Sequence, residues 1–189
     1  MKSALLLIDL QNDYFPGGFM ELFGIDWAAQ NAQHLLNYFR KNHLPLFYIQ
    51  HLMKAEPGTA PFVEGTPGAE IHDSVKPLQD ELVISKHYPN SFRDTNLLYE
   101  LKKAEVEELV ICGGMTHMCI DSTTRAATDL GFKCIVIHDA CATRDIYFRN
   151  HLILAREVHC AILSALETAY AQVLSLREFM TLKSGQAEI

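Results

Sequence analysis

The fold is decided by the stretch Val110-Ile111-Cys112-Gly113-Gly114-Met115-Thr116-His117-Met118-Cys119-Ile120. Its apolar beginning is typical of a buried strand, and the glycine pair breaks that strand. Cys119 then falls at the start of a predicted helix. The orphan N–H groups and positive dipole end of a helix favour a thiolate and can hold an oxyanion, so the stretch predicts a reactive cysteine.

Strand-length apolar runs and segments of helical periodicity alternate on both sides of this stretch. The expected strands are residues 4–8, 46–49, 82–84, 109–112, 134–137 and, more weakly, 173–176. The expected helices are residues 26–42, 95–103, 119–130 and 147–170, and in the first of them Trp27, Leu35, Leu36 and Phe39 share an apolar side. This alternation implies right-handed crossovers and a sheet covered on both faces. The prediction is a Rossmann-like, doubly wound, three-layer α/β/α fold with a mostly parallel sheet of about six strands.

The length of 189 residues fits one domain over residues 1–189. Residues 54–77 are rich in Pro and Gly, which predicts a long excursion of the kind that often serves function. Residues 183–189 are expected to form a loose tail.

Composition limits the classes of partner and compartment. Hydrophobic residues make up 49% and charged residues 21% of the chain, which is typical of a soluble globular protein. The formal charge of -7 and pI near 5.7 argue against nucleic acid as a partner. No stretch approaches the roughly 20 apolar residues of a membrane span, and the first apolar run is too short for a signal peptide. Five cysteines without paired metal spacing favour a reducing cytoplasm.

Two charged residues follow expected strands. Asp9 comes directly after the first strand, and Lys86 follows the third, so both should reach the carboxyl edge of the sheet, where open α/β folds bind ligands. Asp9 could instead only cap the following turn, and Lys86 could be a solvated strand end. Beside a thiol, however, the lysine charge would lower the pKa of that thiol.

Cys119 has a stronger case for reactivity than the other four thiols, since it alone follows a Gly-Gly break after a strand. A buried packing role is the alternative. Cys112 and Cys134 are expected in buried strands, Cys141 in a loop and Cys160 in a helix core.

Two histidines lie near the expected site in sequence. His117 is too close to Cys119 along the chain to act as its base, which favours a pocket wall or a hydrogen bond within the turn. His51, after the second strand, could line the site or bind a metal.

Three segments in order, residues 7–15, 85–92 and 113–120, resemble the isochorismatase-like cysteine hydrolases. The similarity extends through residues 124–127, 129–131 and 139–143, and so covers nearly the whole chain. The resemblance implies that Asp9, Lys86 and Cys119 form a catalytic triad. It also implies a cis peptide between Gly114 and Met115, with the N–H groups of Met115 and Cys119 as the oxyanion hole.

The implied reaction is hydrolysis of a small amide or a related C–N bond through a thioester on Cys119, without a cofactor. Nicotinamidases of this family bind a metal through an Asp-x-His pair, and Ile49 stands here in place of that Asp, so no metal is expected. His72 is interpreted as a loop residue, although an atypical metal role for His51 or His72 stays open. The substrate pocket is expected to be walled by Phe15, His51, Asn90, Phe92 and His117.

Other functions stay open at this stage. A noncatalytic relative could keep the fold and bind a small molecule. Vinyl ether hydrolysis of the isochorismatase type, which uses the acid alone, is disfavoured by the presence of Cys119. Thiol redox chemistry at Cys119 is disfavoured because no second cysteine adjoins it to resolve an oxidised form. The resemblance further implies a homodimer or homotetramer, for which residues 152–166 offer a candidate surface, although the helix expected there must also pack on its own sheet.

Overall fold

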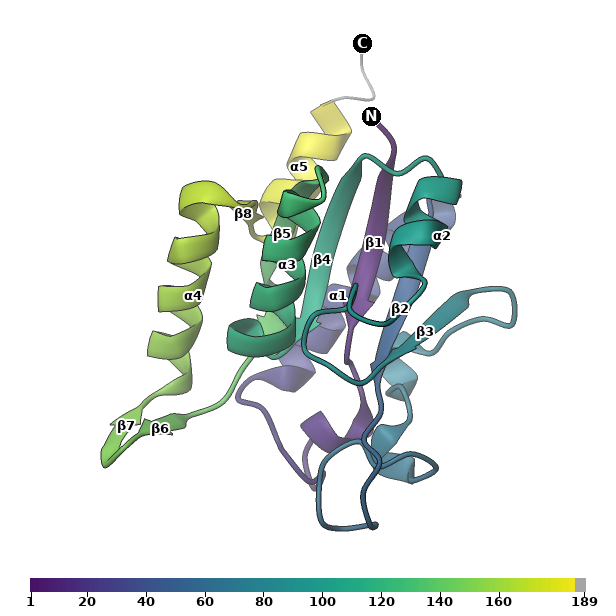
Figure 1. Ribbon diagram of the computed structural model, residues 1–189. Helices are drawn as coiled ribbons and strands as arrows, with labels where there is room; N and C mark the ends of the chain where they lie inside the picture. The colour runs from purple at the N-terminus through teal and green to yellow at the C-terminus, as the bar shows by residue number, and fades with distance from the viewer. Residues whose placement is uncertain (186–189) are drawn as a thin grey trace.

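The structure is a computed structural model and describes residues 1–185. Its central sheet is parallel and has six strands in the order β3-β2-β1-β4-β5-β8 (Figure 1). The strands are β1 (Ser3–Ile8), β2 (Leu46–His51), β3 (Leu82–Lys86), β4 (Glu108–Gly114), β5 (Lys133–Ala142) and β8 (Gln172–Leu174). Every expected strand is present, and the predicted doubly wound α/β fold is confirmed.

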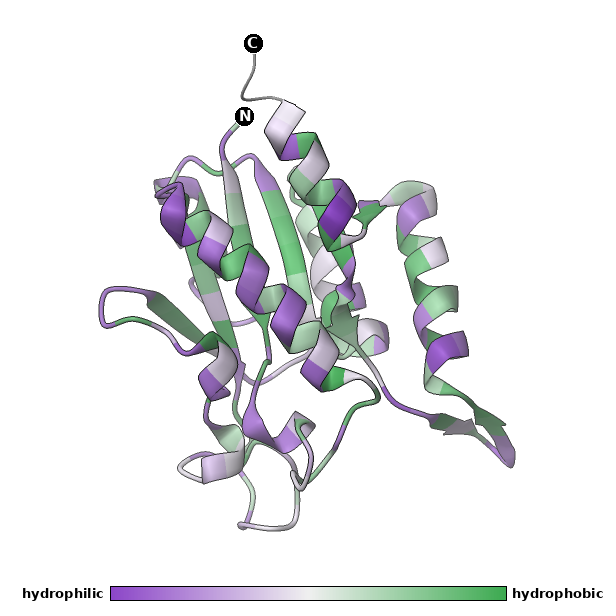
Figure 2. Ribbon diagram, turned by 180° about the vertical axis from the view of Figure 1, so that it is seen from behind, coloured by the Kyte–Doolittle hydropathy of each residue, from purple (hydrophilic) through white to green (hydrophobic). Residues whose placement is uncertain are grey.

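Helices cover both faces of this sheet. One face carries α1 (Ile25–Lys41) and α5 (Leu176–Gly185), seen in front in Figure 2, and the other carries α2 (Leu97–Lys103), α3 (Asp121–Asp129) and α4 (Ala155–Ala169). A hydrophobic core lies on each face of the sheet, and alternate residues of β1 pack into the two cores. Leu5 and Leu7 pack on the side of α1, whereas Leu6 and Ile8 pack on the opposite side. The near-continuous apolar run of β1 is therefore the signature of a strand buried on both sides.

The prediction of one helix over residues 147–170 was wrong in its first part. The chain there forms an antiparallel hairpin of β6 (Ile146–Phe148) and β7 (His151–Ile153), and α4 begins only at Ala155. Arg149, with a φ of 55°, makes the left-handed turn between the two strands. The carboxylate of Asp145 accepts a 2.7 Å hydrogen bond from the Ala155 N–H and so fixes the start of α4.

The apolar side of α1 also differs from the prediction. Leu35, Leu36 and Phe39 are buried as expected, but Trp27 is 67% exposed. The buried stripe begins instead with three alanines, Ala28, Ala29 and Ala32.

Two cysteine placements need correction. Cys141 is a buried residue of β5 rather than a loop residue, and Cys160 lies on the exposed side of α4 rather than in its core. All five thiols are free.

The last described segment forms the helix α5, which is absent from the elements that the sequence predicts. Residues 183–185 of the expected loose tail belong to α5, and Lys183 donates a 2.9 Å hydrogen bond to the carboxylate of Glu108 in β4. The remainder of that expected tail, residues 186–189, lies outside the described residues. The excursion at residues 54–77 is ordered and contains two short helical turns, η2 (Pro67–Ala69) and η3 (Asp73–Val75).

Candidate active site

The candidate site lies where the winding of the sheet reverses. The chain runs outward from β1 through β2 to β3, and then returns to add β4, β5 and β8 on the other side of β1. The carboxyl ends of β1 and β4 are therefore neighbours at the switch point, which is the position at which open α/β sheets bind ligands. Asp9 follows β1, Lys86 ends β3, and Cys119 follows β4.

The end of β4 lies so close to β1 that position 113 has room only for glycine. Gly113 has a φ of +126°, and a Cβ at this position would lie 1.9 Å from the carbonyl oxygen of Ile8. The next peptide bond, Gly114–Met115, is cis. A π-helical turn, η4 (Thr116–Ile120), then leads directly into α3. Cys119 thus lies in the first turns of a helix, and such π turns are frequent at functional sites.

Asp9 and Lys86 form a buried ion pair. The Lys86 Nζ donates to Asp9 Oδ2 at 2.8 Å, and neither side chain is exposed. Burial opposes the charge on both groups, but their mutual attraction outweighs it: the pKa of Asp9 is lowered, with His51 contributing, and the pKa of Lys86 is raised. The carbonyl oxygens of Tyr88 and Pro89 lie 3.2 and 3.4 Å from the ammonium and help to hold it.

The surroundings of Cys119 oppose ionisation of its thiol. Burial and the adjacent carboxylate of Asp9 raise the pKa of the thiol well above its ordinary value, and the Lys86 ammonium offsets them only in part. Lys86 acts in the expected direction and lowers this pKa, but burial and Asp9 outweigh it. Asp9 Oδ1 is buried and has no hydrogen-bond partner within residues 1–185, so it is free to receive a proton.

His51 is a fourth ionisable group in contact with this cluster. Its Nδ1 lies 3.2 Å from Lys86 Nζ and 3.9 Å from Cys119 Sγ. An ammonium can only donate, so its contact with His51 is a hydrogen bond where Nδ1 is the acceptor; Nδ1 also lies 3.8 Å from Asp9 Oδ2. Gln11 fixes the backbone of His51 from both sides, accepting from its N–H and donating to its carbonyl at 2.8 Å each. The ring is stacked on Phe62 at 5.8 Å.

The cluster does not fit a resident divalent metal. Donor atoms of Asp9, His51 and Cys119 do lie within 4.8 Å of one another, and carboxylate, imidazole and thiolate are all ligands of zinc. The Lys86 ammonium, however, contacts two of these donors and would face the cation directly. Ile49, at the position of the metal-binding Asp of nicotinamidases, is buried in the core.

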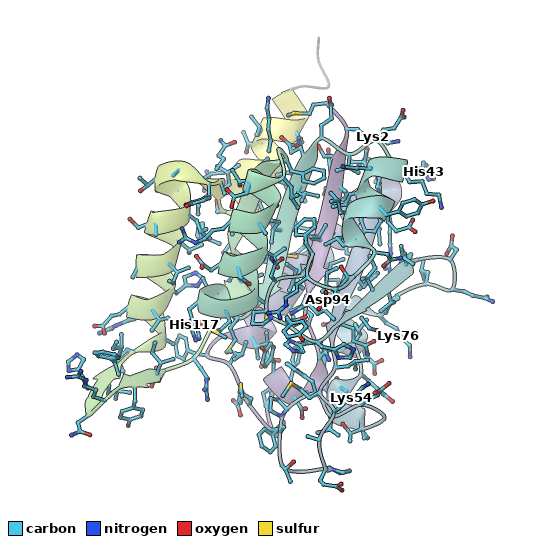
Figure 3. The ribbon with its side chains drawn as sticks, viewed as in Figure 1. Lys2, His43, Lys54, Lys76, Asp94 and His117 are labelled. Carbon is cyan, nitrogen blue, oxygen red and sulfur yellow. The ribbon has the colours of Figure 1, made fainter. Side chains whose placement is uncertain are left out.

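The expected wall residues differ in where they lie. Phe15 stacks on His72 with ring centroids 3.5 Å apart. His117 lies at the lower end of α3 in Figure 3 and contacts Thr143 Oγ1 through its Nδ1 at 2.5 Å. Burial lowers the pKa of His117, as it does that of His72.

The two wall residues after Lys86 have structural contacts. Asn90 accepts a hydrogen bond from the N–H of Phe92 within its own turn, at 2.9 Å. Phe92 stacks on Phe132 with centroids 6.2 Å apart, within the core on the α2–α3 side.

Sequence reasoning missed the residues that support the site. Gln11 positions His51, and Asp13 accepts hydrogen bonds from the N–H groups of Phe19 and Phe62, which ties the first loop to the excursion at residues 54–77. The available signal was the spacing of Asp9, Gln11 and Asp13 in one short segment. Their partners are distant in sequence, so the spacing alone could not have named them.

The fold and the site together define a class of protein: a doubly wound α/β fold with a buried acid, lysine and cysteine at the switch point of its sheet. A family model, the isochorismatase domain, matches residues 3–176. The isochorismatase family protein YddQ of Bacillus subtilis is 47% identical over 181 residues, which are 95% of this chain and 99% of that protein. The chain belongs to the isochorismatase family of hydrolases.

Two further relatives extend this comparison. An isochorismatase hydrolase structure from Oleispira antarctica has a TM-score of 0.91 and 47% identity, and covers 95% of this chain and 96% of its own. Maleamate amidohydrolase of Pseudomonas putida is 28% identical over 192 residues, covering 95% of this chain and 85% of that enzyme. Within residues 1–185, no helix has the length and apolar character to cross a membrane.

Proposed function

We propose that this protein is a cysteine hydrolase that cleaves a small amide or a related C–N bond through a thioester on Cys119. The observation that carries the proposal is the junction of a thiol, an ionised carboxylate and a buried ammonium at the switch point of the sheet. A relative named maleamate amidohydrolase supports the choice of an amide. Cys119 is only 3% exposed, which favours a small substrate.

In the first half of the proposed reaction, Asp9 Oδ1 takes the proton of Cys119 as the sulfur attacks the carbonyl carbon. A C–S bond forms, and the carbonyl electron pair moves onto oxygen, where the N–H groups of Met115 and Cys119 hold it. The C–N bond then breaks, and Asp9 returns the proton to the departing ammonia or amine. The acyl group remains on the sulfur as a thioester.

In the second half, water gives a proton to Asp9 while its oxygen attacks the thioester carbon. The C–S bond breaks, the carboxylic acid leaves, and the proton returns from Asp9 to Cys119. Lys86 keeps Asp9 ionised at the start of each half-reaction and balances the negative charge that passes between oxygen and sulfur.

The test is release of ammonia from a panel of small primary amides and ureido compounds. Wild type, Cys119→Ala and the control Cys160→Ser, which changes an exposed thiol on α4, are run in parallel. We expect release by wild type and the control, and a loss of about 1,000-fold or more in Cys119→Ala. Turnover unchanged in Cys119→Ala would contradict a sulfur nucleophile and favour hydrolysis by the acid alone. Saturable binding of an amide without turnover would favour the noncatalytic alternative.

A further inference from the structure

The ammonium of Lys86 is held both by side chains of the site and by the backbone that follows it. It contacts Asp9 Oδ2 at 2.8 Å and His51 Nδ1 at 3.2 Å. Its other contacts are the carbonyl oxygens of Tyr88 and Pro89, at 3.2 and 3.4 Å. Both carbonyls belong to residues 87–92, which follow β3 and which we call the Lys86 loop. An ammonium donates only three hydrogen bonds, so the position of this loop helps to decide where Nζ lies relative to Asp9.

The Lys86 loop is tied to α3 by a buried hydroxyl group. Thr123 Oγ1 accepts a 3.0 Å hydrogen bond from the N–H of Ser91 and donates to the carbonyl oxygen of Pro89 at 3.4 Å. Ser91 Oγ lies 2.8 Å from the same Thr123 oxygen. A hydroxyl has one proton and two lone pairs, so these three contacts use its whole hydrogen-bonding capacity. Thr123 and Ser91 are both 0% exposed, so a bond lost here is not replaced by bulk water.

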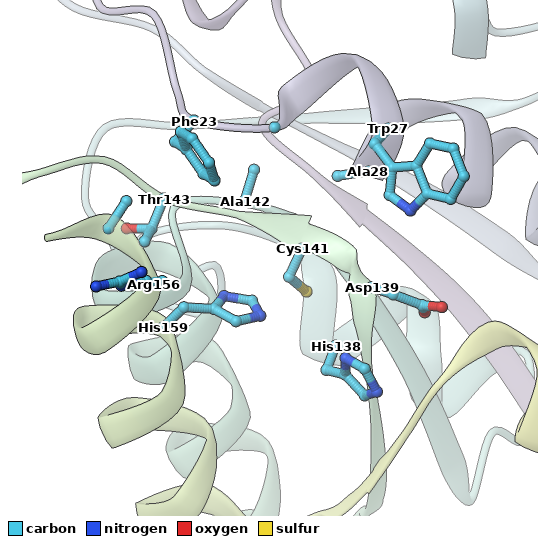
Figure 4. A pocket seen from close by; sticks show the side chains of 12 residues that line it. Phe23, Trp27, Ala28, His138, Asp139, Cys141, Ala142, Thr143, Arg156 and His159 are labelled. Carbon is cyan, nitrogen blue, oxygen red and sulfur yellow. The ribbon is translucent and has the colours of Figure 1, made fainter.

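The helical segment that carries Thr123 also carries the candidate nucleophile. Cys119 lies in η4, which runs directly into α3, and Thr123 follows it by about one helical turn. The start of this segment is held from α4, because Thr116 Oγ1 lies 2.8 Å from the Nδ1 of His159. His159 stands on the wall of a separate cavity of about 450 Å³, which the triad residues do not line (Figure 4). With η4 held in this way, loss of the Thr123 hydroxyl should displace the Lys86 loop rather than the thiol.

Other contacts made by polar groups of the Lys86 loop are local. The Thr95 hydroxyl donates to the carbonyl oxygen of Ser91 at 2.6 Å, and the guanidinium of Arg93 lies 3.6 Å above the ring of Tyr88. These contacts shape the loop, but they do not connect it to η4 or α3. The link to the segment of Cys119 is the one that Thr123 makes.

We propose that Thr123 is a positioning residue, which holds the Lys86 ammonium on Asp9 through Ser91 and the carbonyl group of Pro89. The inference rests on the proposed function, in which Lys86 keeps Asp9 ionised and balances the negative charge of the reaction. The helix that presents the thiol therefore also sets the place of the cation. Placement of this kind matters because small displacements of groups around a reacting centre cost a large part of the rate.

Thr123→Val removes the hydroxyl but keeps the shape of the side chain, and it should raise the pKa of Asp9. Burial raises that pKa and Lys86 lowers it, so an ammonium held less closely leaves burial with more weight. Because Asp9 acts as the base, the acid side of the pH–rate profile should move to higher pH as well. Other titratable groups that face Asp9 are unchanged by this substitution: Tyr14 of η1 (Asn12–Tyr14), His51 of β2 and Cys119 of η4.

The matched control is Thr124→Val. Thr124 is the next residue of α3 and is also 0% exposed, but its hydroxyl donates to the carbonyl oxygen of Ile120 in the same helical segment, at 2.7 Å. Within residues 1–185 no hydrogen bond joins its side chain to the Lys86 loop. The control therefore repeats the substitution, the helix and the burial without the link. Thr123→Ser, which keeps the hydroxyl, is the conservative variant that should restore wild-type behaviour.

The first measurement needs no substrate. NMR follows the chemical shift of the Asp9 carboxyl carbon during a pH titration, with Asp9→Asn to assign the signal. We expect the midpoint to rise by at least about 0.5 in pH in Thr123→Val, and to keep the wild-type value in Thr123→Ser and Thr124→Val. Circular dichroism checks that each variant is folded. If Thr123→Val does not fold, Ser91→Ala gives the same test with a smaller rise, since it removes one of the three contacts.

The second measurement is the pH dependence of turnover with an amide that wild type cleaves. We expect kcat to fall about 10- to 100-fold in Thr123→Val with little change in KM, because Lys86 acts on the chemical steps. A raised Asp9 midpoint in a protein that cleaves no amide would support the positioning role and contradict the proposed function. An Asp9 midpoint in Thr123→Val equal to that of wild type, or an equal rise in Thr124→Val, would overturn the positioning role whether or not an amide is cleaved.

Discussion

At the scale of residues, the ion pair of Lys86 with Asp9 is the interaction with the largest expected effect on stability. Lys86→Met would leave the Asp9 carboxylate buried without its cation, which typically costs about 3–5 kcal/mol. We expect a loss of unfolding free energy of about 3 kcal/mol near neutral pH and loss of activity. Urea unfolding measures this change, with Lys103→Met, which breaks an exposed ion pair, as the control.

The dependence on pH and on Asp9 identifies the cause of that loss. In wild type the folded-state pKa of Asp9 is lowered, so its stabilising contribution is complete above the unfolded pKa and is lost as the pH falls through the folded one. Without Lys86, burial raises that pKa, and the penalty should shrink as acid protonates Asp9. Asp9→Asn combined with Lys86→Met should recover stability but not activity. An equal loss of unfolding free energy from Lys86→Met in wild type and in Asp9→Asn would contradict the explanation by an unpaired carboxylate.

The state of the Cys119 thiol is tested by alkylation in a Cys160→Ser background, since Cys160 is exposed and would react first. With its pKa raised, Cys119 should react slowly at neutral pH, and its rate should still be rising beyond pH 9, past the ordinary thiol pKa of about 8.5. Mass spectrometry at a series of pH values measures the rate. A plateau below pH 8 would show a stored thiolate and refute transfer of the proton to Asp9.

The site residues that could be predicted from the sequence are those that lie at the end of a recognisable strand. Asp9 and Lys86 follow apolar runs, and a parallel sheet brings such ends to one edge. The pKa of Cys119 was not predictable, because burial by distant segments decides it. His117 is two residues from Cys119 yet bonds Thr143, whereas His51 is distant in sequence and contacts the thiol.

At the scale of elements, the junction of β1 and β4 depends on one glycine. Gly113→Ala would place a methyl group 1.9 Å from the Ile8 carbonyl oxygen at a φ of +126°. Since backbone must move at the switch point, we expect a loss of about 4 kcal/mol or more in unfolding free energy. Gly131→Ala is the matched control: its φ is +93° but a Cβ would have open space, so the cost should be about 1 kcal/mol. Thermal and urea unfolding compare the two, and similar costs would contradict the steric account.

The elements predicted correctly are those whose periodicity is strong and local. Buried strands give continuous apolar runs, and α1 repeats its apolar positions over several turns. The β6–β7 hairpin was not predictable in this way, since its aromatic residues Tyr147 and Phe148 are exposed and leave no buried periodic pattern. In α5 only Phe179 is buried, so the pattern of that helix is weak in sequence.

At the scale of the whole molecule, the sequence predicted the layers. It predicted neither the order of the strands in the sheet nor the packing of α5 on that sheet. Alternation of strands and helices implies a three-layer fold, whereas the order β3-β2-β1-β4-β5-β8 follows from tertiary pairing. The segment expected to be loose contributes Lys183, whose ammonium lies 2.9 Å from the carboxylate of Glu108. Ser3 Oγ donates to the same carboxylate at 2.6 Å, so the first strand, the fourth strand and the last helix meet there.

This junction predicts that the C-terminal helix stabilises the whole fold. Lys183→Met would leave Glu108, which is only 6% exposed, with Ser3 as its remaining side-chain partner. We expect unfolding free energy to fall by about 2 kcal/mol, between the typical costs for surface and fully buried pairs. Glu108→Gln in the same chain should lower the cost, since the amide carries no charge to leave unpaired. Urea unfolding of the two single variants and the double variant gives the coupling energy, and a coupling near zero would mean that α5 packs through Phe179 alone.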